Sequence, residues 1–193
     1  MAVRKVIQIG HPALKAKNKE VKNFNSPTIK KLIKDLTDTM HKHQLIGIAA
    51  PQIAENYKVF ATEVRNTKYR KLSKQDKLRI YINPKIIRTS KEQNVIYEGC
   101  GCVGPPHIFG PVKRPKEITI EALDVKGNKF RLRCDGILSR VIQHEFDHTN
   151  GIEYLEKVHD YKKLMAEEYY QKIRNSKEQG KASKNSTIEF QKL

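Results

Sequence analysis

Apolar residues in the first third of the chain recur at the spacing of one helix face. Five of them lie three or four positions apart around such a face: Ile29, Leu32, Ile33, Leu36 and Met40. Ser26 and Pro27 precede them, and serine is a common N-cap residue while proline fits the first helical turn. The pattern predicts an amphipathic helix from residue 27 to about His43.

Shorter apolar runs follow this helix, and their valine, isoleucine and aromatic residues favour strands. Five runs are predicted as strands: residues 58–64, 80–87, 94–97, 117–123 and 130–133. Lys126-Gly127-Asn128 predicts a hairpin turn between the last two runs. Gly104-Pro105-Pro106 and Gly110-Pro111 predict a rigid loop before residue 117.

The helical period returns between Asp135 and Asn150, where four apolar residues share a face: Leu138, Val141, Ile142 and Phe146. Gly151 is well placed to end this helix. A C-terminal helix is predicted from Tyr161 to Arg174, and the polar residues 175–193 are expected to form a mobile tail. The order of elements predicts a single α+β domain over residues 1–174, with antiparallel strands packed around the helix 135–150.

Composition supports one folded domain without a membrane segment. At 193 residues, with 38% hydrophobic and 31% charged residues, the chain has enough apolar material for one core, which excludes disorder throughout. No apolar run approaches the roughly 20 residues of a membrane span. Three cysteines, an odd number, fit a reducing compartment. We therefore expect a cytoplasmic protein that has no membrane contact.

The formal net charge of +17 is unevenly distributed. Between Arg65 and Arg79 there is one acid, Asp76, against seven basic residues: Arg65, Lys68, Arg70, Lys71, Lys74, Lys77 and Arg79. Such a segment is attracted to polyanions. It is interpreted either as a solvated surface loop, the usual outcome for a run of charge, or as a contact with ribosomal RNA.

The segment His144-Glu145-Phe146-Asp147-His148 carries an H-E-x-x-H pattern inside the predicted helix 135–150. The two imidazoles lie one turn apart on the same face, where they could bind one metal together. Glu145 lies beside that face without having to ligate, so its carboxylate is free to accept a proton from water. The pattern by itself indicates a metal-dependent hydrolase, and the alternative is a surface helix with two ordinary histidines.

A catalytic site of this kind needs a third protein ligand and an open position for water. His159 and Glu153 are available downstream, as in an H-E-x-x-H metallopeptidase. Cys100 is available upstream, at the end of a strand and between glycines, and we favour it because a thiolate binds divalent metals strongly. Cys102 would close the open position if it ligated. Cys134 is interpreted as a small buried hydrophobic residue.

Three ordered motifs resemble those of the peptide deformylases, with similarity from about Arg4 to Leu155. They are Gly47-Ile48-Ala49-Ala50-Pro51-Gln52, Glu98-Gly99-Cys100 and Gln143-His144-Glu145-Phe146-Asp147-His148. The N-terminal VIQIGHPAL segment and Ile82-Asn83-Pro84 also stand in family positions. The resemblance implies removal of the formyl group from N-formylmethionyl nascent peptides.

The resemblance also implies roles for particular residues. Cys100, His144 and His148 would hold Fe(II), which zinc, nickel or cobalt can replace. Glu145 would carry the proton, and the Gln52 side chain with the Gly101 backbone N–H would stabilise the oxyanion. Substrate contacts are expected at four positions: Leu45, Gly47, Ile48 and Val141.

The sequence departs from the family pattern at three positions near this site. Leu45 stands where the family usually has glycine, and Gly101-Cys102 stand where it has Leu-Ser. The segment from Cys102 to Arg114 is also longer than usual. The alternative is therefore a deformylase-like protein that has lost most of its turnover through these departures and binds the ribosome or RNA through its basic surface.

Overall fold

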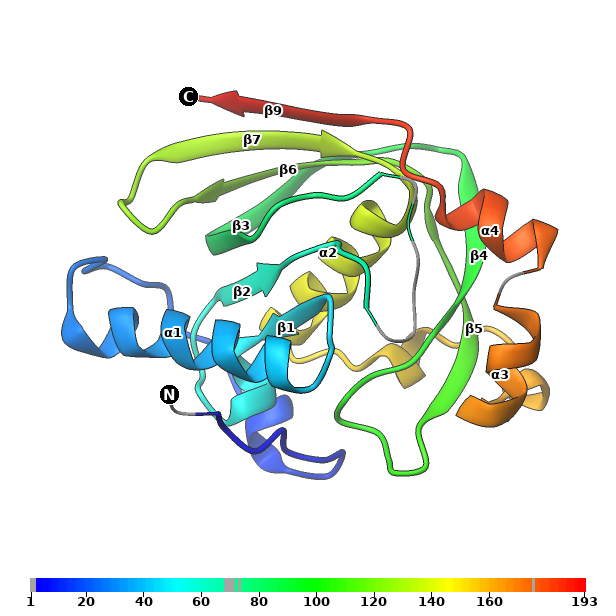
Figure 1. The fold of residues 1–193 in the computed structure, drawn as a ribbon. Helices are drawn as coiled ribbons and strands as arrows, with labels where there is room; N and C mark the ends of the chain where they lie inside the picture. Colours follow the sequence, from blue (N-terminus) through cyan, green and yellow to red (C-terminus); the bar gives the residue numbers. More distant parts are fainter. Residues whose placement is uncertain (1–2, 68–71, 73, 175) are drawn as a thin grey trace.

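Two antiparallel sheets enclose one buried helix in the computed structural model, which describes residues 3–67, 72, 74–174 and 176–193 (Figure 1). The larger sheet contains, in spatial order, β1 (Gly47–Ala49), β2 (Val59–Thr62), β3 (Arg79–Thr89), β6 (Ile118–Leu123), β7 (Lys129–Cys134) and β9 (Ile188–Lys192). The smaller sheet contains β4 (Gln93–Glu98), β5 (Ile108–Pro115) and β8 (Met165–Ala166). This arrangement confirms the predicted α+β class and the central position of the metal-motif helix.

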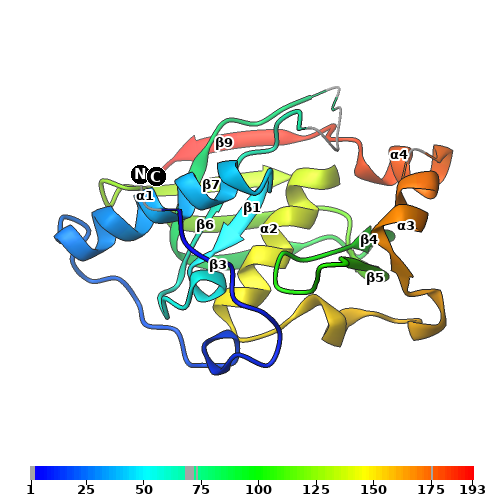
Figure 2. The ribbon, with the colours of Figure 1, turned by 60° about the horizontal axis from the view of Figure 1, so that its bottom comes forward.

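Helix α1 (Pro27–Lys42) begins and ends where the apolar pattern predicts. The Ser26 hydroxyl accepts a hydrogen bond from the backbone N–H of Ile29, which satisfies one of the free donors of the first turn. Leu36 and Met40 are completely buried on the inner face of the helix. The helix therefore covers the part of the larger sheet formed by β1 and β2 (Figure 2).

Helix α2 (Gly136–Thr149) lies between the two sheets and carries the H-E-x-x-H motif. Because both sheets contact it, nearly all of its residues are buried, including its polar ones. Gly151, with a φ of +73°, follows the C-cap residue Asn150, as the sequence predicts. A helix this deeply enclosed holds its side chains in fixed positions.

Asn83 explains one of the sequence features in β3. Its φ is +49°, at a register shift between β3 and β6. Its side-chain amide accepts a hydrogen bond from the Val21 N–H and donates one to the Val21 carbonyl, each at 2.9 Å. Asparagine tolerates this left-handed backbone conformation and pairs with main-chain groups, so it fixes the N-terminal segment to the sheet.

The five predicted strands are present, but four further strands were not predicted: β1, β5, β8 and β9. Gly110-Pro111 lies inside β5, where Pro111 is opposite Tyr97, so the prediction of a loop there was wrong. The predicted helix from Tyr161 to Arg174 is also wrong in its first half. Residues Met165 and Ala166 pair with β5 instead, and helix α3 (Glu167–Ile173) begins only after this pairing ends.

Residues 165–193, which we call the C-terminal segment, continue with α4 (Lys177–Ser183) and β9. The polar residues 175–193 were expected to form a mobile tail, yet β9 pairs with β7 along five residues. Strand β9 completes the edge of the larger sheet, and α3 and α4 lie beside the smaller sheet (Figures 1 and 2). Among the helices of the described residues, none is long and apolar enough to cross a bilayer.

Candidate metal centre

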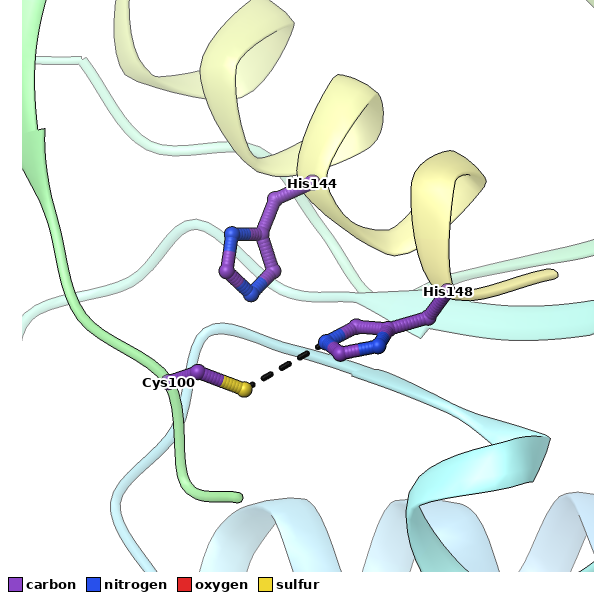
Figure 3. A group of neighbouring side chains, drawn as sticks. All are labelled: Cys100, His144 and His148. Atoms are coloured by element: carbon purple, nitrogen blue, oxygen red, sulfur yellow. Dashed lines mark hydrogen bonds between the residues drawn. The ribbon is translucent and has the colours of Figure 1, made fainter. Parts of the chain in front are cut away.

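Three buried side chains converge between β4 and α2. Cys100 follows the end of β4, and His144 and His148 lie one turn apart on α2 (Figure 3). One potential ligand atom from each residue lies within 4.8 Å of those of the other two. Sγ of Cys100 is 3.3 Å from Nε2 of His148. No other group of three or more metal-binding side chains is found among the described residues.

This set of donors fits a divalent transition metal. A thiolate and two imidazoles are ligands that zinc and iron accept, and three protein ligands leave a coordination position for water. The neighbouring Cys102 thiol and burial raise the pKa of Cys100 to about 11, and a cation bound here would favour the thiolate form. Oε2 of Glu145 is buried beside this group without a hydrogen-bond partner among the described residues.

The alternative ligands lie outside the group. Nδ1 of His159 is 2.9 Å from the carbonyl oxygen of Pro111, and Glu153 forms an ion pair with Lys15 at 3.0 Å. Cys102 is buried but does not belong to the ligand group. Cys134 lies completely buried in the apolar core, where burial raises the pKa of its thiol far above the usual range.

Glu98 organises the buried charges around the ligands, a role that the sequence analysis did not assign. Its two oxygens accept hydrogen bonds from Arg114 at 2.7 and 3.0 Å and from Arg140 at 2.8 Å. Nδ1 of His144 is 2.9 Å from Oε2 of Glu98. Because a carboxylate only accepts, Nδ1 carries the proton and the lone pair of Nε2 is left for a metal.

The charges of this network favour a cation among the ligands. Burial alone would raise the pKa of Glu98, but Arg114 and His144 hold it well below its usual range. Burial alone would likewise lower the pKa of His144, but Cys100, Glu98 and Glu145 raise it well above its usual range. The same negative neighbours that favour a proton on the imidazole also favour a metal ion beside it.

Glu145 is held directly above Gly47 of β1. A Cβ atom on Gly47 would lie 2.5 Å from Oε1 of Glu145 and 2.5 Å from Cγ1 of Val141, so only glycine leaves room for these side chains. Burial raises the pKa of Glu145 to about 7. A carboxyl group with such a pKa can both accept and return a proton near neutral pH.

The side-chain amide of Gln52 faces the sulfur of Cys100. Its Oε1 accepts a hydrogen bond from the Ala49 N–H at 2.7 Å, which fixes the amide so that Nε2 points inward. Nε2 is 3.4 Å from Sγ of Cys100 and 3.6 Å from Sγ of Cys102. Gly101 is held through its carbonyl oxygen, which accepts a hydrogen bond from the Gln8 side chain at 3.0 Å.

A cavity extends from this centre between β1, β4 and α2, and we call it the inner cavity. Leu45, Gly47, Gly101 and Val141 line it, as do the apolar residues Ile96 and Ile137. Ile48, which was expected to contact the substrate, is completely buried in the core and is not among the lining residues. Side chains alternate along a strand, so Ile48 of β1 points away from the face that Gly47 presents to the cavity.

Two further lining residues were not predicted, Arg140 and Phe109. Arg140 lies one turn before His144 on α2, so its distance from the motif could have suggested that it faces the site. Glu98 could have been found in a similar way, because it stands two residues before Cys100 and carboxylates often orient metal-bound histidines. Phe109 gave no such signal, since it lies in the strand that was predicted as a loop.

Comparisons with known proteins agree with this geometry. Residues 3–164 match the family model described as polypeptide deformylase. Peptide deformylase 2 from Nostoc sp. is 36% identical over 170 residues, which cover 87% of this chain and 93% of that protein. The peptide deformylase from Carboxydothermus hydrogenoformans is 37% identical and covers 81% of this chain and 94% of its own.

Solved structures show the same fold. A peptide deformylase from Ehrlichia chaffeensis in complex with actinonin has a TM-score of 0.75 and 28% identity, and the match covers 92% of this chain and 99% of that one. A class I type b peptide deformylase from Acinetobacter baumannii bound to Met-Ala-Ser has a TM-score of 0.76 and 28% identity, with 82% and 100% covered. The chain belongs to the polypeptide deformylase family.

Proposed function

We propose that the metal centre removes the formyl group from N-formylmethionyl peptides and that Glu145 carries the proton. The observation that supports this most directly is the buried Oε2 of Glu145, which has no hydrogen-bond partner among the described residues and lies beside Cys100, His144 and His148. A buried carboxylate oxygen without a partner is costly unless a reacting group or water uses it. The reaction converts the formamide and water into formate and a free amine.

We assign Cys100, His144 and His148 as the metal ligands and Fe(II) as the natural metal, which zinc, nickel or cobalt can replace. A metal held by these residues would act as a Lewis acid and would lower the pKa of a water molecule beside it. Glu98 orients His144 by accepting its Nδ1 proton. Gly47 leaves the space that Glu145 needs, so the carboxylate stays beside the water position.

In the proposed sequence, Glu145 first accepts a proton from the attacking water and then delivers it to the departing amine nitrogen. The oxygen of this water forms a bond to the formyl carbon, and the carbon–nitrogen bond breaks. Nε2 of Gln52 and the Gly101 backbone N–H donate hydrogen bonds to the formyl oxygen as its negative charge develops. The fixed position of the Gln52 amide supports its role, because a preorganised donor needs little rearrangement.

The methionine side chain fits the apolar end of the inner cavity, near Ile96, Ile137 and Val141. The solved deformylase bound to Met-Ala-Ser supports a peptide of this kind as the product. Leu45 occupies the rim of the same cavity, where it narrows the approach of the substrate. Formyl has no carbon substituent on its carbonyl, so a narrow site admits it and excludes larger acyl groups.

Replacement of Glu145 by glutamine tests the assignment of the proton carrier. The Glu145→Gln protein should keep one metal per chain, while formate release from formyl-Met-Ala-Ser should fall by at least about 10²–10⁴-fold. Glu153→Gln, which alters another buried glutamate near α2, should retain the metal and most of the activity. Loss of metal from the Glu145→Gln protein, by elemental analysis, would indicate that Glu145 is a ligand instead.

We also propose a contact with ribosomal RNA through the basic segment Arg65–Arg79, and a cytoplasmic location. Residues 68–71 and 73 of this segment lie outside the described residues, while Arg79 forms an ion pair with Asp76. The cytoplasmic location is supported by the three cysteines, which are free and buried, as expected in a reducing compartment. Changing Lys68, Arg70, Lys71 and Lys74 to Gln should weaken co-sedimentation with ribosomes and reduce its salt dependence. Unchanged co-sedimentation would exclude the contact.

A further inference from the structure

A second cavity, which we call the outer cavity, adjoins the inner cavity. The two cavities share wall residues, including Leu45, Gly99, Gly101 and Phe109. The outer cavity extends from Cys100 between residues 43–46 and helix α3. The site proposed for the formyl group and the cavity proposed for the methionine side chain both border this shared wall, so we expect the residues after methionine to reach the outer cavity.

Helix α3 forms the far wall of the outer cavity. Glu167, Tyr170 and Arg174 line it, and their spacing of three and four positions places them on one face of the helix. The Glu167 N–H donates a hydrogen bond to the His107 carbonyl at 3.0 Å, which fixes the start of α3 next to β5. All three residues lie beyond residues 3–164, the part of the chain that matches the family model.

An aromatic stack joins this wall to the metal-binding loop. The Tyr170 ring lies on the Phe109 ring with their centroids 4.1 Å apart and their planes 12° from parallel. Phe109 in turn contacts Gly99 so closely that a Cβ atom there would lie 2.6 Å from the ring. The position of α3 is therefore set by contacts that end one residue from the ligand Cys100.

The wall carries a positive charge without an acidic partner. Arg174 is half-buried, and within the described part of the chain it forms no ion pair with an acid. The Glu167 carboxylate already accepts a hydrogen bond from Gln171 at 3.4 Å, and it lies in the first turn of α3, where negative charge is favoured. His107 is also engaged, through Nδ1, with the Val103 carbonyl at 2.9 Å. Among the described residues that line this cavity, Arg174 is the only arginine or lysine, so it is the permanent positive charge available to a carboxylate.

We propose that Arg174 is a specificity-determining residue that binds an aspartate or glutamate side chain among the residues that follow formylmethionine. This inference rests on the proposed deformylase function. A guanidinium binds a carboxylate through two parallel hydrogen bonds, which gives such a site geometric as well as electrostatic selectivity. The selectivity belongs to the C-terminal segment of this chain, since that segment supplies the wall.

A series of matched peptides tests the proposal on the unaltered protein. Formyl-Met-Ala-Ala-Ala is compared with peptides in which Asp, Asn or Lys replaces one alanine, and kcat and KM are measured by formate release. Aspartate at one or more positions should raise kcat/KM over asparagine by about fivefold, mainly through KM, as expected for a partly exposed ion pair. The advantage should shrink at about 0.5 M salt, because screening weakens such pairs.

Variants of α3 locate the effect. Arg174→Gln should bring the ratio of kcat/KM for the aspartate and asparagine peptides close to one, and Arg174→Glu should favour the lysine peptide over the asparagine peptide. Lys172→Gln is the matched control, because it removes the same charge from an exposed position of the same helix. The ratio should be unchanged in this control.

Equal kcat/KM for the aspartate and asparagine peptides at every position would overturn the proposal, whether or not the variants fold. An equal loss of the ratio in Lys172→Gln and Arg174→Gln would also overturn it, because the general charge of the helix would then be responsible. If no peptide in the series releases formate, the proposed function itself is wrong. Formate release without charge selectivity would leave the proposed function intact and refute only the role of Arg174.

Discussion

The metal centre and the C-terminal segment are held in place by different kinds of contact. Around the metal centre, charged side chains fix one another, as Glu98 does with Arg114 and Arg140. In the C-terminal segment, most of the fixing contacts involve the backbone, as in the pairing of β9 with β7. Side-chain identity is therefore decisive at the metal centre, whereas β9 of the C-terminal segment is held mainly by backbone pairing.

The two regions nevertheless depend on each other. The Asp135 carboxylate, just before α2, accepts hydrogen bonds from the backbone N–H groups of Ser186 and Thr187 at 2.7 and 2.8 Å. The Leu138 N–H, in the first turn of α2, donates a hydrogen bond to Asn185 at 3.0 Å. The helix that carries His144 and His148 is thus anchored at its start by the C-terminal segment.

The largest effect on stability is expected from Glu98→Gln. This change leaves Arg114 and Arg140 buried beside a neutral group, so the free energy of unfolding should fall by about 3–5 kcal/mol. Glu117→Gln removes a carboxylate from the exposed pair with Arg133 and should lower the free energy of unfolding much less, because solvent screens this pair. Urea unfolding measures both changes. Equal losses of unfolding free energy would show that the buried network contributes no more to stability than the exposed pair.

The two neighbouring cysteines are expected to differ in their contribution to metal binding. Cys100→Ser replaces a thiolate ligand by a neutral hydroxyl and should weaken zinc binding by about 100-fold or more, since even losing an outer hydrogen-bond partner of a ligand costs roughly 10–100-fold. Cys102→Ser should keep one metal per chain and most of the activity. Competition with a chelator measures the affinities. Similar metal loss from both proteins would indicate a site with two thiolates.

The smallest effect is expected in the C-terminal segment, from Gln179→Ala. Oε1 of Gln179 accepts a hydrogen bond from the Tyr97 N–H at 3.2 Å, and its Nε2 donates one to the Val95 carbonyl at 3.4 Å. Loss of both bonds from the edge of β4 should lower the free energy of unfolding by about 1–2 kcal/mol. Metal content should not change. Gln171→Ala, at an exposed position of α3, is the control, and an equal loss there would contradict the role of Gln179.

The sequence predicted which three side chains meet at the candidate metal centre, because metal-binding chemistry restricts the residue types. Two histidines one turn apart on a helix face the same side, so their imidazoles meet. Cys100 follows a predicted strand and lies between two glycines, which allow close approach of the backbone. The hydrogen bonds of Glu98 with the two arginines could not be predicted from the sequence. They depend on Arg114 and Arg140, which lie 16 and 42 positions away and meet the carboxylate only in the folded protein.

The sequence predicted the C-terminal segment poorly because polar residues there form structure through their backbone. Strand β9 has one half-buried residue, Ile188, and four exposed ones, so it lacks the alternation that indicates a strand. Strand β5 was missed for another reason, since Gly110-Pro111 is typical of a loop. In both cases the strand is defined by its partner, and the partner is distant in sequence.

The network around Glu98 also determines which charge the site accommodates. With Glu145 ionised and the imidazoles neutral, two positive groups meet four negative ones: Arg114 and Arg140 against Glu98, Asp147, Glu145 and the Cys100 thiolate. The buried assembly therefore lacks two positive charges, which one divalent cation supplies. A divalent cation held by Cys100, His144 and His148 would therefore balance the buried charges, whereas a trivalent one would leave a positive charge in a region of low dielectric constant.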